Sequence, residues 1–360
     1  MIYFFSYITI LFSACCEILI SLKRRVDSRK MALFLFALSF SIIAGIRYGV
    51  GIDYFTYYGI FSRTTEFSID YFFTIQWLEP GFRLLVYLLN RAGFSAYFMF
   101  FFFAFLSLTL LTKGIKKSSN LSLFSFFVFF CLFYTTYIFN VMRQGIVMCL
   151  FVYLLDDISK RDLKKVFLLS LVGISIHYSG IFILLSYFLY SLRISKRNVV
   201  LLILAGLLMI IVNTHVSRIL IPLIPGYVGD KLLSYHTSRG ASIDIFNLLQ
   251  RLLIFIPFIG FYERLKSLKP NFLGFFNMYI VGFLLYGLFS FEALFATRIN
   301  MFFRILEVVL VPYVVEIHNS RINRLVLFAL LGLWLTVVFV SQLRSPSNFP
   351  FITIFDVAWR

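Results

Sequence analysis

Short basic turns separate long apolar segments along nearly the whole of this chain. Six turns carry clustered Lys and Arg, at residues 23–30, 113–117, 160–165, 193–197, 264–269 and 321–324. Lys and Arg in short loops mark the cytoplasmic side of a membrane protein. Placing the first basic turn inside puts all six turns inside, with the N-terminus and the C-terminus outside. This alternation predicts a polytopic membrane protein with a fixed orientation.

The composition supports the same fold class. The 360 residues are 61% hydrophobic and 14% charged, with a mean hydropathy of +0.92, which leaves too little polar surface for a soluble globule. A spanning helix needs about 20 apolar residues, which gives about 12 helices in a single all-α membrane domain over residues 1–360. The expected spans are 2–22, 31–46, 95–112, 121–139, 141–155, 165–177, 178–191, 198–221, 245–262, 271–290, 303–317 and 323–341.

The net charge of +17 comes mostly from the Lys and Arg of the basic turns, which orient the protein in the membrane. These residues do not form one exposed face. We therefore expect no nucleic-acid partner. The four cysteines lie within apolar runs, without a C-x-x-C motif and without a histidine at metal-ligand spacing. We read them as packing residues and expect no metal and no cofactor.

Two stretches differ from ordinary connections. Residues 47–95 form an expected outer loop, in which Glu79 precedes Pro80 and the apolar piece 84–89 is too short to cross a bilayer. We interpret that piece as a re-entrant or interfacial helix. Residues 222–244 are an expected second outer loop, able to cover a site.

The candidate site lies among the ionisable residues on the outer side, because a charge at membrane depth is costly and usually lines a functional cavity. Arg143 lies between two closely joined spans, with Asn140 before it and Gln144 after it. A guanidinium can hold phosphate oxygens through two parallel hydrogen bonds and stays protonated. The alternative is an interfacial arginine that reaches lipid headgroups.

Arg298 and Arg304 precede another apolar run and have a similar potential role. Six residues apart, they share a helical face only if the helix starts between them or is distorted. At least one of them is an interfacial anchor in the alternative interpretation.

His177, Asp53 and Glu79 are the candidates for proton transfer. His177 interrupts a long apolar stretch and suits acid–base work or a hydrogen bond to phosphate, with a satisfied helix-turn histidine as the alternative. A carboxylate of Asp53 or Glu79 can accept a proton from a sugar hydroxyl, hold sugar hydroxyls, or chelate a divalent ion beside a diphosphate, although the chemistry does not demand a metal. Alternatively, each carboxylate pairs with a nearby arginine such as Arg47 or Arg83.

Five motifs in this order resemble the EpsG-type family of exopolysaccharide proteins, which is grouped with Wzy-type O-antigen and capsule polymerases. The motifs are Arg47-x-x-x-Gly51-x-Asp53-Tyr54, Glu79-Pro80-Gly81-Phe82, Phe139-Asn140-x-x-Arg143-Gln144, His177-Tyr178-Ser179, and Arg298 and Arg304 ahead of Val311-Pro312-Tyr313. The resemblance covers roughly residues 40–315. Gly51-Ile52-Asp53 stands where the family often has Gly-Thr-Asp, so the chain keeps the Asp and lacks the hydroxyl.

The resemblance implies a glycosyltransferase similar to the membrane-embedded GT-C type. Such polymerases join undecaprenyl-diphosphate-linked repeat units at the outer face of the bacterial cytoplasmic membrane, alongside a flippase and a chain-length regulator. In this chain, the expected catalytic residues are Glu79, Asp53 and His177. The expected substrate-binding residues are Arg47, Asn140, Arg143, Gln144, Arg298 and Arg304.

Two other classes of function remain as alternatives. A flippase for lipid-linked oligosaccharides needs polar residues along the whole path, whereas the candidates here gather at one face. A membrane O-acyltransferase that modifies the glycan needs a route for a cytoplasmic acyl donor. Formation of a polymer ladder from a purified lipid-linked repeat separates both from a polymerase.

Overall fold

The computed structural model describes residues 1–19, 26–64, 78–220 and 245–358, and these residues are helical without any strand. The chain divides into two compact units. The first comprises Met1–Tyr187 and Glu307–Arg360, and the second comprises Phe188–Leu306. Each unit is described by itself. The expected outer loop at 222–244 lies outside the described residues, as do residues 65–77 of the first expected outer loop.

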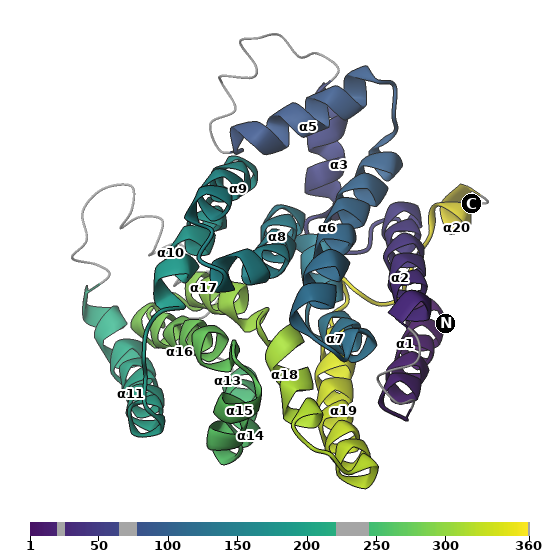
Figure 1. Cartoon of the computed structure of the whole chain (residues 1–360). Helices are drawn as coiled ribbons and strands as arrows, with labels where there is room; N and C mark the ends of the chain where they lie inside the picture. The colour runs from purple at the N-terminus through teal and green to yellow at the C-terminus, as the bar shows by residue number, and fades with distance from the viewer. Residues whose placement is uncertain (20–25, 65–77, 221–244, 359–360) are drawn as a thin grey trace. The chain divides into compact units, whose positions relative to one another are not determined.

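The first unit contains most of the helices in Figure 1. They are α1 (Ile2–Leu19), α2 (Val26–Ile46), α3 (Tyr54–Arg63), α5 (Pro80–Arg91), α6 (Ala96–Ser118), α7 (Ser122–Phe129), the π-helix η2 (Phe130–Asn140), α8 (Met142–Ser159), α9 (Leu163–Ile176), the 3₁₀ turn η3 (Tyr178–Gly180), most of α10 (Ile181–Leu189), α18 (Glu307–Glu316), α19 (Arg321–Leu343) and α20 (Ile354–Ala358). Helix α6 packs on both α2 and α8. Gly114 allows the contact with α8, because a Cβ there would lie 2.4 Å from the carbonyl oxygen of Val152.

The second unit is smaller. Its helices are α11 (Lys196–Leu220), α13 (Ile245–Leu253), α14 (Phe255–Gly260), α15 (Tyr262–Leu268), α16 (Phe272–Leu288) and α17 (Ala293–Arg304). Helix α16 packs on α11 and on α17. Gly287 and Gly206 bring the backbones of α16 and α11 together, since a Cβ on Gly287 would lie 2.5 Å from the carbonyl oxygen of Gly206.

Six helices among the described residues are long and apolar enough to cross a membrane. They are Ile2–Leu19, Ser28–Ile46, Ala96–Ser118, Ser122–Asn140, Lys196–Asn213 and Arg321–Leu343. A seventh crossing results if the pair Ile245–Gly260 and Tyr262–Leu268, bent by 66°, counts as one span. Several other expected spans form short helices, such as α9 with 14 residues and α10 with nine. The membrane fold is therefore supported, while twelve crossings, a single domain and a GT-C-like arrangement stay predictions.

The span Ser122–Asn140 is the buried centre of the first unit, because nearly all of its residues are covered by other helices. Its second half is the π-helix η2, in which each carbonyl accepts the N–H five residues later in place of four. Gln342 of α19 adds a second donor to this segment, since its amide nitrogen donates to the carbonyls of Cys131 and Leu132 at 3.1 and 3.2 Å. Its amide oxygen accepts from the Thr135 hydroxyl at 2.7 Å. Such π segments are frequent beside functional sites.

Candidate functional site

The motif Glu79-Pro80-Gly81 starts helix α5 and fixes where it packs. Glu79 is extended, with φ −66° and ψ 143°, as expected for a residue before proline, and Pro80 occupies the first helical position. A Cβ on Gly81 would lie 2.3 Å from the Ser175 hydroxyl and 2.8 Å from the Ser175 carbonyl oxygen. Only glycine therefore lets α5 begin against the end of α9. Helix α5 lies against α9, α6 and α3 in Figure 1.

Three of the sequence motifs meet at the carboxylate of Glu79. One carboxylate oxygen forms an ion pair with the guanidinium of Arg143. The other accepts the backbone N–H of Tyr178, the residue after His177, at 3.3 Å. The Glu79 side chain is only 2% exposed, whereas that of Arg143 is 19% exposed. The pair is thus buried on the carboxylate side and reachable on the arginine side.

Helix α8 places Arg143 at its second residue, where it also meets Tyr57 of α3. The positive charge of Arg143 lowers the pKa of Tyr57 against the larger effect of burial, which raises it, so the phenol and the guanidinium interact electrostatically. The guanidinium carbon lies 5.7 Å from the ring centroid of Phe82 on α5, which adds a cation–π contact. The Nε of Arg143 is buried and has no hydrogen-bond partner among the described residues. The exposed part of the Arg143 side chain therefore lies elsewhere than at Nε.

Asp53 lies one helical turn before Tyr57 and interacts electrostatically with it. Through Tyr57, Asp53 is connected to Arg143 and Glu79. Asp53 occupies the position before α3 without capping it, and it is half-buried. Burial raises the pKa of Tyr57, and the charge of the Asp53 carboxylate raises it further, while Arg143 lowers it. Tyr57 is therefore a neutral phenol that links the two charged residues.

His177 ends α9 and begins the turn η3. Its Nδ1 accepts the backbone N–H of Ser179 at 3.2 Å and lies 2.8 Å from the Ser179 hydroxyl. An Nδ1 that accepts a hydrogen bond favours the neutral tautomer with its proton on Nε2. The ring is half-buried, next to the Tyr178 N–H that binds Glu79.

Asn140 holds the loop that follows α2. Its amide oxygen accepts the backbone N–H of Ile52 and its amide nitrogen donates to the Thr135 carbonyl at 3.1 Å. Gly51 adopts a positive φ of 107°, and a Cβ there would lie 2.7 Å from the Asn140 amide oxygen. Asn140, predicted to bind substrate, thus supports the backbone in the described structure.

Arg47 is fully buried. Its guanidinium donates to the carbonyls of Ala44, Val50 and Phe139 at 2.8 to 3.1 Å. It also stacks over Phe100, at 4.4 Å from the ring centroid. Every guanidinium nitrogen is engaged with backbone, so Arg47 tethers the α2 loop to the end of η2.

The same loop pairs with the C-terminal part of the chain. The backbone N–H of Tyr48 donates to the Ile352 carbonyl at 2.8 Å, and that of Gly51 donates to the Ser347 carbonyl at 2.7 Å. Arg47 and Thr353 form an isolated antiparallel bridge. Residues 347–353 therefore help to fix the loop on which Asp53 lies.

The structure thus brings Glu79, Arg143, Asp53 and the His177 turn together in the first unit. Asn140 and Arg47 hold the loop on which Asp53 lies. Gln144 follows Arg143 on α8 and is 1% exposed. The sequence left open whether Glu79 pairs with a nearby arginine such as Arg47 or Arg83. In the structure Glu79 does form an ion pair with an arginine, and that arginine is Arg143.

Arg298 and Arg304 belong to the second unit. Both lie on α17, Arg298 exposed and Arg304 buried at its last turn, with Nη1 of Arg304 3.5 Å from the Met301 sulfur. They differ in exposure, as expected for residues on different helical faces. Their roles as substrate ligands stay predictions.

Two polar residues of interest were missed in the sequence. Tyr57 is not among the candidate residues in the sequence analysis, although its position one turn after Asp53 indicates a shared face. Arg251, in the apolar run of α13, is 3% exposed and donates to the Asn300 amide oxygen at 2.8 Å. A charged residue inside an expected span was its signal.

Comparison with known proteins gives one positive result. The model of the EpsG family matches residues 30–353 of this chain. No curated protein and no solved structure matches the chain significantly.

Proposed function

The chain belongs to the EpsG family of polysaccharide polymerase-like membrane proteins, and from this premise we propose that it polymerises undecaprenyl-diphosphate-linked repeat units. The reaction takes place at the outer face of the bacterial cytoplasmic membrane. A hydroxyl of the acceptor unit attacks the anomeric carbon of the donor chain. The bond from that carbon to the diphosphate breaks, and undecaprenyl diphosphate leaves.

The observation that carries this proposal is the buried ion pair between Glu79 and Arg143, closed by the Tyr178 N–H. The reaction needs a group that stabilises a leaving diphosphate and a group that takes the hydroxyl proton. The pair supplies both kinds of group side by side. The two residues come from motifs 64 residues apart in the sequence, and the Glu79 side chain is buried, so the pair differs from an incidental ion pair at the protein surface.

Arg143 has the role of diphosphate ligand. Its side chain is 19% exposed, so a ligand can reach it, and its guanidinium is held from within the protein by Glu79 and by the ring of Phe82. A diphosphate that binds Arg143 competes with Glu79 for the same guanidinium. Binding of the donor therefore releases one carboxylate oxygen of Glu79.

Glu79 then has the role of proton acceptor for the attacking hydroxyl. The Tyr178 N–H continues to hold its other oxygen, so the carboxylate keeps its orientation when Arg143 turns to the diphosphate. His177, in the tautomer with the proton on Nε2, donates to a diphosphate oxygen. Asp53 holds sugar hydroxyls from the start of α3. Arg298 and Arg304 stay candidates for substrate binding, as predicted from the sequence.

A polymerisation assay with purified protein in vesicles tests this assignment. The substrate is a lipid-linked repeat, and the product is a glycan ladder. Glu79→Gln keeps the size of the side chain and an oxygen for the Tyr178 N–H, but it loses the charge that pairs with Arg143 and cannot accept the proton. Turnover therefore falls about a hundredfold to ten-thousandfold while substrate still binds. Asp53→Asn weakens binding and shortens the product.

The outcomes separate the alternatives. Near-normal turnover in Glu79→Gln, with loss in His177→Ala, makes histidine the base. Movement of the intact repeat across the vesicle membrane without a ladder indicates a flippase. Transfer of an acyl group to the glycan without a ladder indicates an O-acyltransferase.

A further inference from the structure

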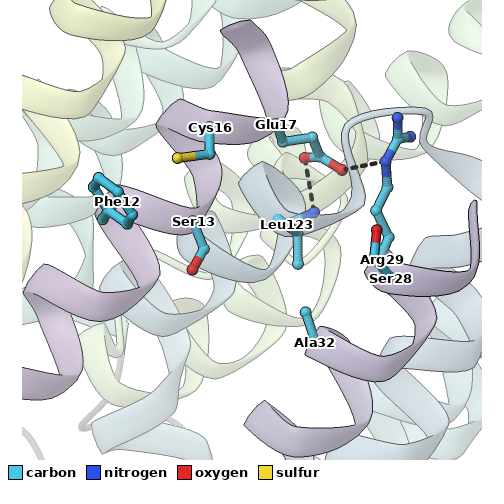
Figure 2. A pocket seen from close by; sticks show the side chains of 8 residues that line it. All are labelled: Phe12, Ser13, Cys16, Glu17, Ser28, Arg29, Ala32 and Leu123. Atoms are coloured by element: carbon cyan, nitrogen blue, oxygen red, sulfur yellow. Dashed lines mark hydrogen bonds and ion pairs between the residues drawn. The ribbon is translucent and has the colours of Figure 1, made fainter. Parts of the chain in front are cut away.

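A cavity of about 230 Å³ opens between α1 and α2, apart from the site around Glu79. Figure 2 shows its lining, which includes Phe12, Ser13 and Glu17 of α1, Arg29 and Ala32 of α2, and Leu123 of α7. The 19-residue span Ser122–Asn140 starts at this cavity and ends at Asn140, beside the loop of the candidate site. The cavity thus lies at the other end of the first unit, which the basic turn at 23–30 predicts to be cytoplasmic.

The carboxylate of Glu17 is used within the protein. It accepts the backbone N–H groups of Leu123 and Phe124 at 2.9 and 3.0 Å, and the Ser122 hydroxyl at 3.3 Å. These groups form the first turn of α7, whose helix dipole favours a negative charge. The Glu17 side chain is 0% exposed. Its charge is therefore compensated by the helix end and is hidden from a ligand.

Arg29 supplies the charge that the cavity presents. Its Nε lies 3.8 Å from the Glu17 carboxylate, an ion pair beyond hydrogen-bond distance, and its side chain is 18% exposed. Its Nη1 donates to the Asn120 carbonyl at 3.1 Å, which holds the side chain at the cavity. Residues 23–30 carry five basic residues and one acidic residue, so the surroundings in the sequence are cationic as well.

The lining changes from polar to apolar in the direction of the bilayer interior. Phe12 precedes Glu17 by five residues on α1, and Ala32 follows Arg29 by three residues on α2. At 1.5 Å per residue, these apolar groups lie roughly 5–8 Å further along the helices than the charged ones. Phe12 is 69% exposed, which fits a side chain in contact with lipid tails.

From this geometry we propose that the cavity binds an anionic phospholipid of the inner leaflet. The phosphate lies at the Arg29 guanidinium, and the first part of one acyl chain lies against Phe12 and Ala32. Charge complementarity selects the headgroup, because basic residues between membrane helices on the cytoplasmic side attract anionic lipid. The lipid joins α1 to α2 next to the start of α7. This inference does not depend on the proposed polymerase reaction.

Thermal unfolding of the full-length protein in detergent micelles tests the proposal. Dioleoylphosphatidylglycerol at about 100 times its dissociation constant raises the unfolding temperature by roughly 5 °C, whereas dioleoylphosphatidylcholine does not. Ala32→Phe fills the cavity without touching a polar contact and removes the shift. Arg29→Gln removes the charge and also removes the shift. Native mass spectrometry counts the bound lipid in parallel.

Matched controls identify a specific site. Lys30→Gln loses the same charge next to Arg29, and Met31→Phe adds the same ring next to Ala32, but neither residue lines the cavity. Both controls keep the shift. The proposal is overturned if phosphatidylcholine gives the same shift, if Ala32→Phe retains it, or if Lys30→Gln abolishes it. A shift produced by glycerol phosphate alone also overturns it, because the site then binds free phosphate and not a lipid.

Discussion

At the scale of single residues, the site depends on partners that are specific to arginine. Arg143 makes an ion pair with Glu79, an electrostatic contact with Tyr57 and a ring contact with Phe82. A guanidinium is planar and directs several N–H groups at once, whereas an ammonium is a compact point charge. The arrangement therefore depends on the shape of the group as well as on its charge.

We predict that Arg143→Lys loses polymer formation nearly as completely as Arg143→Ala. The lysine keeps the charge but cannot hold a diphosphate through two parallel hydrogen bonds while it contacts Tyr57. Polymer length on gels, at equal amounts of membrane protein, measures the effect. Arg91→Lys, at an exposed position of α5, is the control and keeps normal length. Normal polymer in Arg143→Lys would reduce Arg143 to an interfacial anchor.

A second prediction concerns the contact of Gly81 with Ser175. The methyl group of Gly81→Ala has no room against α9, and such overpacking costs about 1–3 kcal/mol of unfolding free energy. A lowered unfolding temperature, with loss of activity because Glu79 shifts, is the expected result. Gly59→Ala, within α3 and with nothing within 4 Å of the new Cβ, is neutral or more stable by up to about 1 kcal/mol. Equal stability of the two variants would contradict the proposed packing of α5.

At the scale of secondary-structure elements, the π-helix η2 is the unusual feature. It continues α7, ends at Asn140 and leads directly into α8 and Arg143. Gln342, which follows Cys131 and Leu132 of η2 by 211 and 210 residues in the sequence, donates additional hydrogen bonds to their carbonyls. Helix α19 thus contributes to the site without reaching it, by fixing the end of the central span.

We predict that Gln342→Leu destabilises this element. The carbonyls of Cys131 and Leu132 keep their π-helical backbone bonds but lose the Gln342 donor, and the Thr135 hydroxyl loses its acceptor, at a net cost of about 0.5–1.5 kcal/mol for each hydrogen bond. Thermal unfolding and polymer length are the measurements, and both decrease. Ser341→Ala is the control on the same helix, because its hydroxyl bonds back to Val338 of α19 itself. An unchanged unfolding temperature in Gln342→Leu would show that η2 does not depend on α19.

At the scale of the whole molecule, the basic turns predict the orientation in the membrane. Within the first unit, Glu17 and Arg29 lie at the start of the span Ser122–Asn140, and Asn140 lies at its end. One end therefore has the basic turn and the other has the candidate site. This separation agrees with an outward site, which remains a prediction from loop charge.

Single cysteines in a variant without the four native ones test that orientation. Ala92→Cys and Ser345→Cys react with an impermeant thiol reagent in intact cells, because both lie at predicted outer connections. Ser195→Cys and Ser267→Cys lie in basic turns and react only after the membrane is permeabilised. Ala92, Ser195 and Ser267 are exposed in the structure and Ser345 is half-buried, so exposure does not favour the two outer positions over the two in basic turns. Labelling of all four from outside would refute the orientation.

The sequence by itself determined the class of the molecule, because apolar segments and basic turns are local features that decide insertion into a bilayer and orientation in it. The all-helical fold, the membrane character and the family follow from it. The same local features did not determine the number of membrane crossings, since the length and bending of each helix depend on packing.

Only the tertiary structure decided which of the charged residues in the motifs support the fold and which face the candidate site. Arg47 and Arg143 look alike in the sequence, yet one is enclosed by backbone carbonyls and the other faces Glu79 with one side exposed. Glu79 and Arg143 are 64 residues apart, and their meeting depends on Gly81 fitting against Ser175 and on Tyr178 turning its N–H inward. Burial and hydrogen-bond satisfaction of a charged group are set by these long-range contacts, which no local pattern encodes.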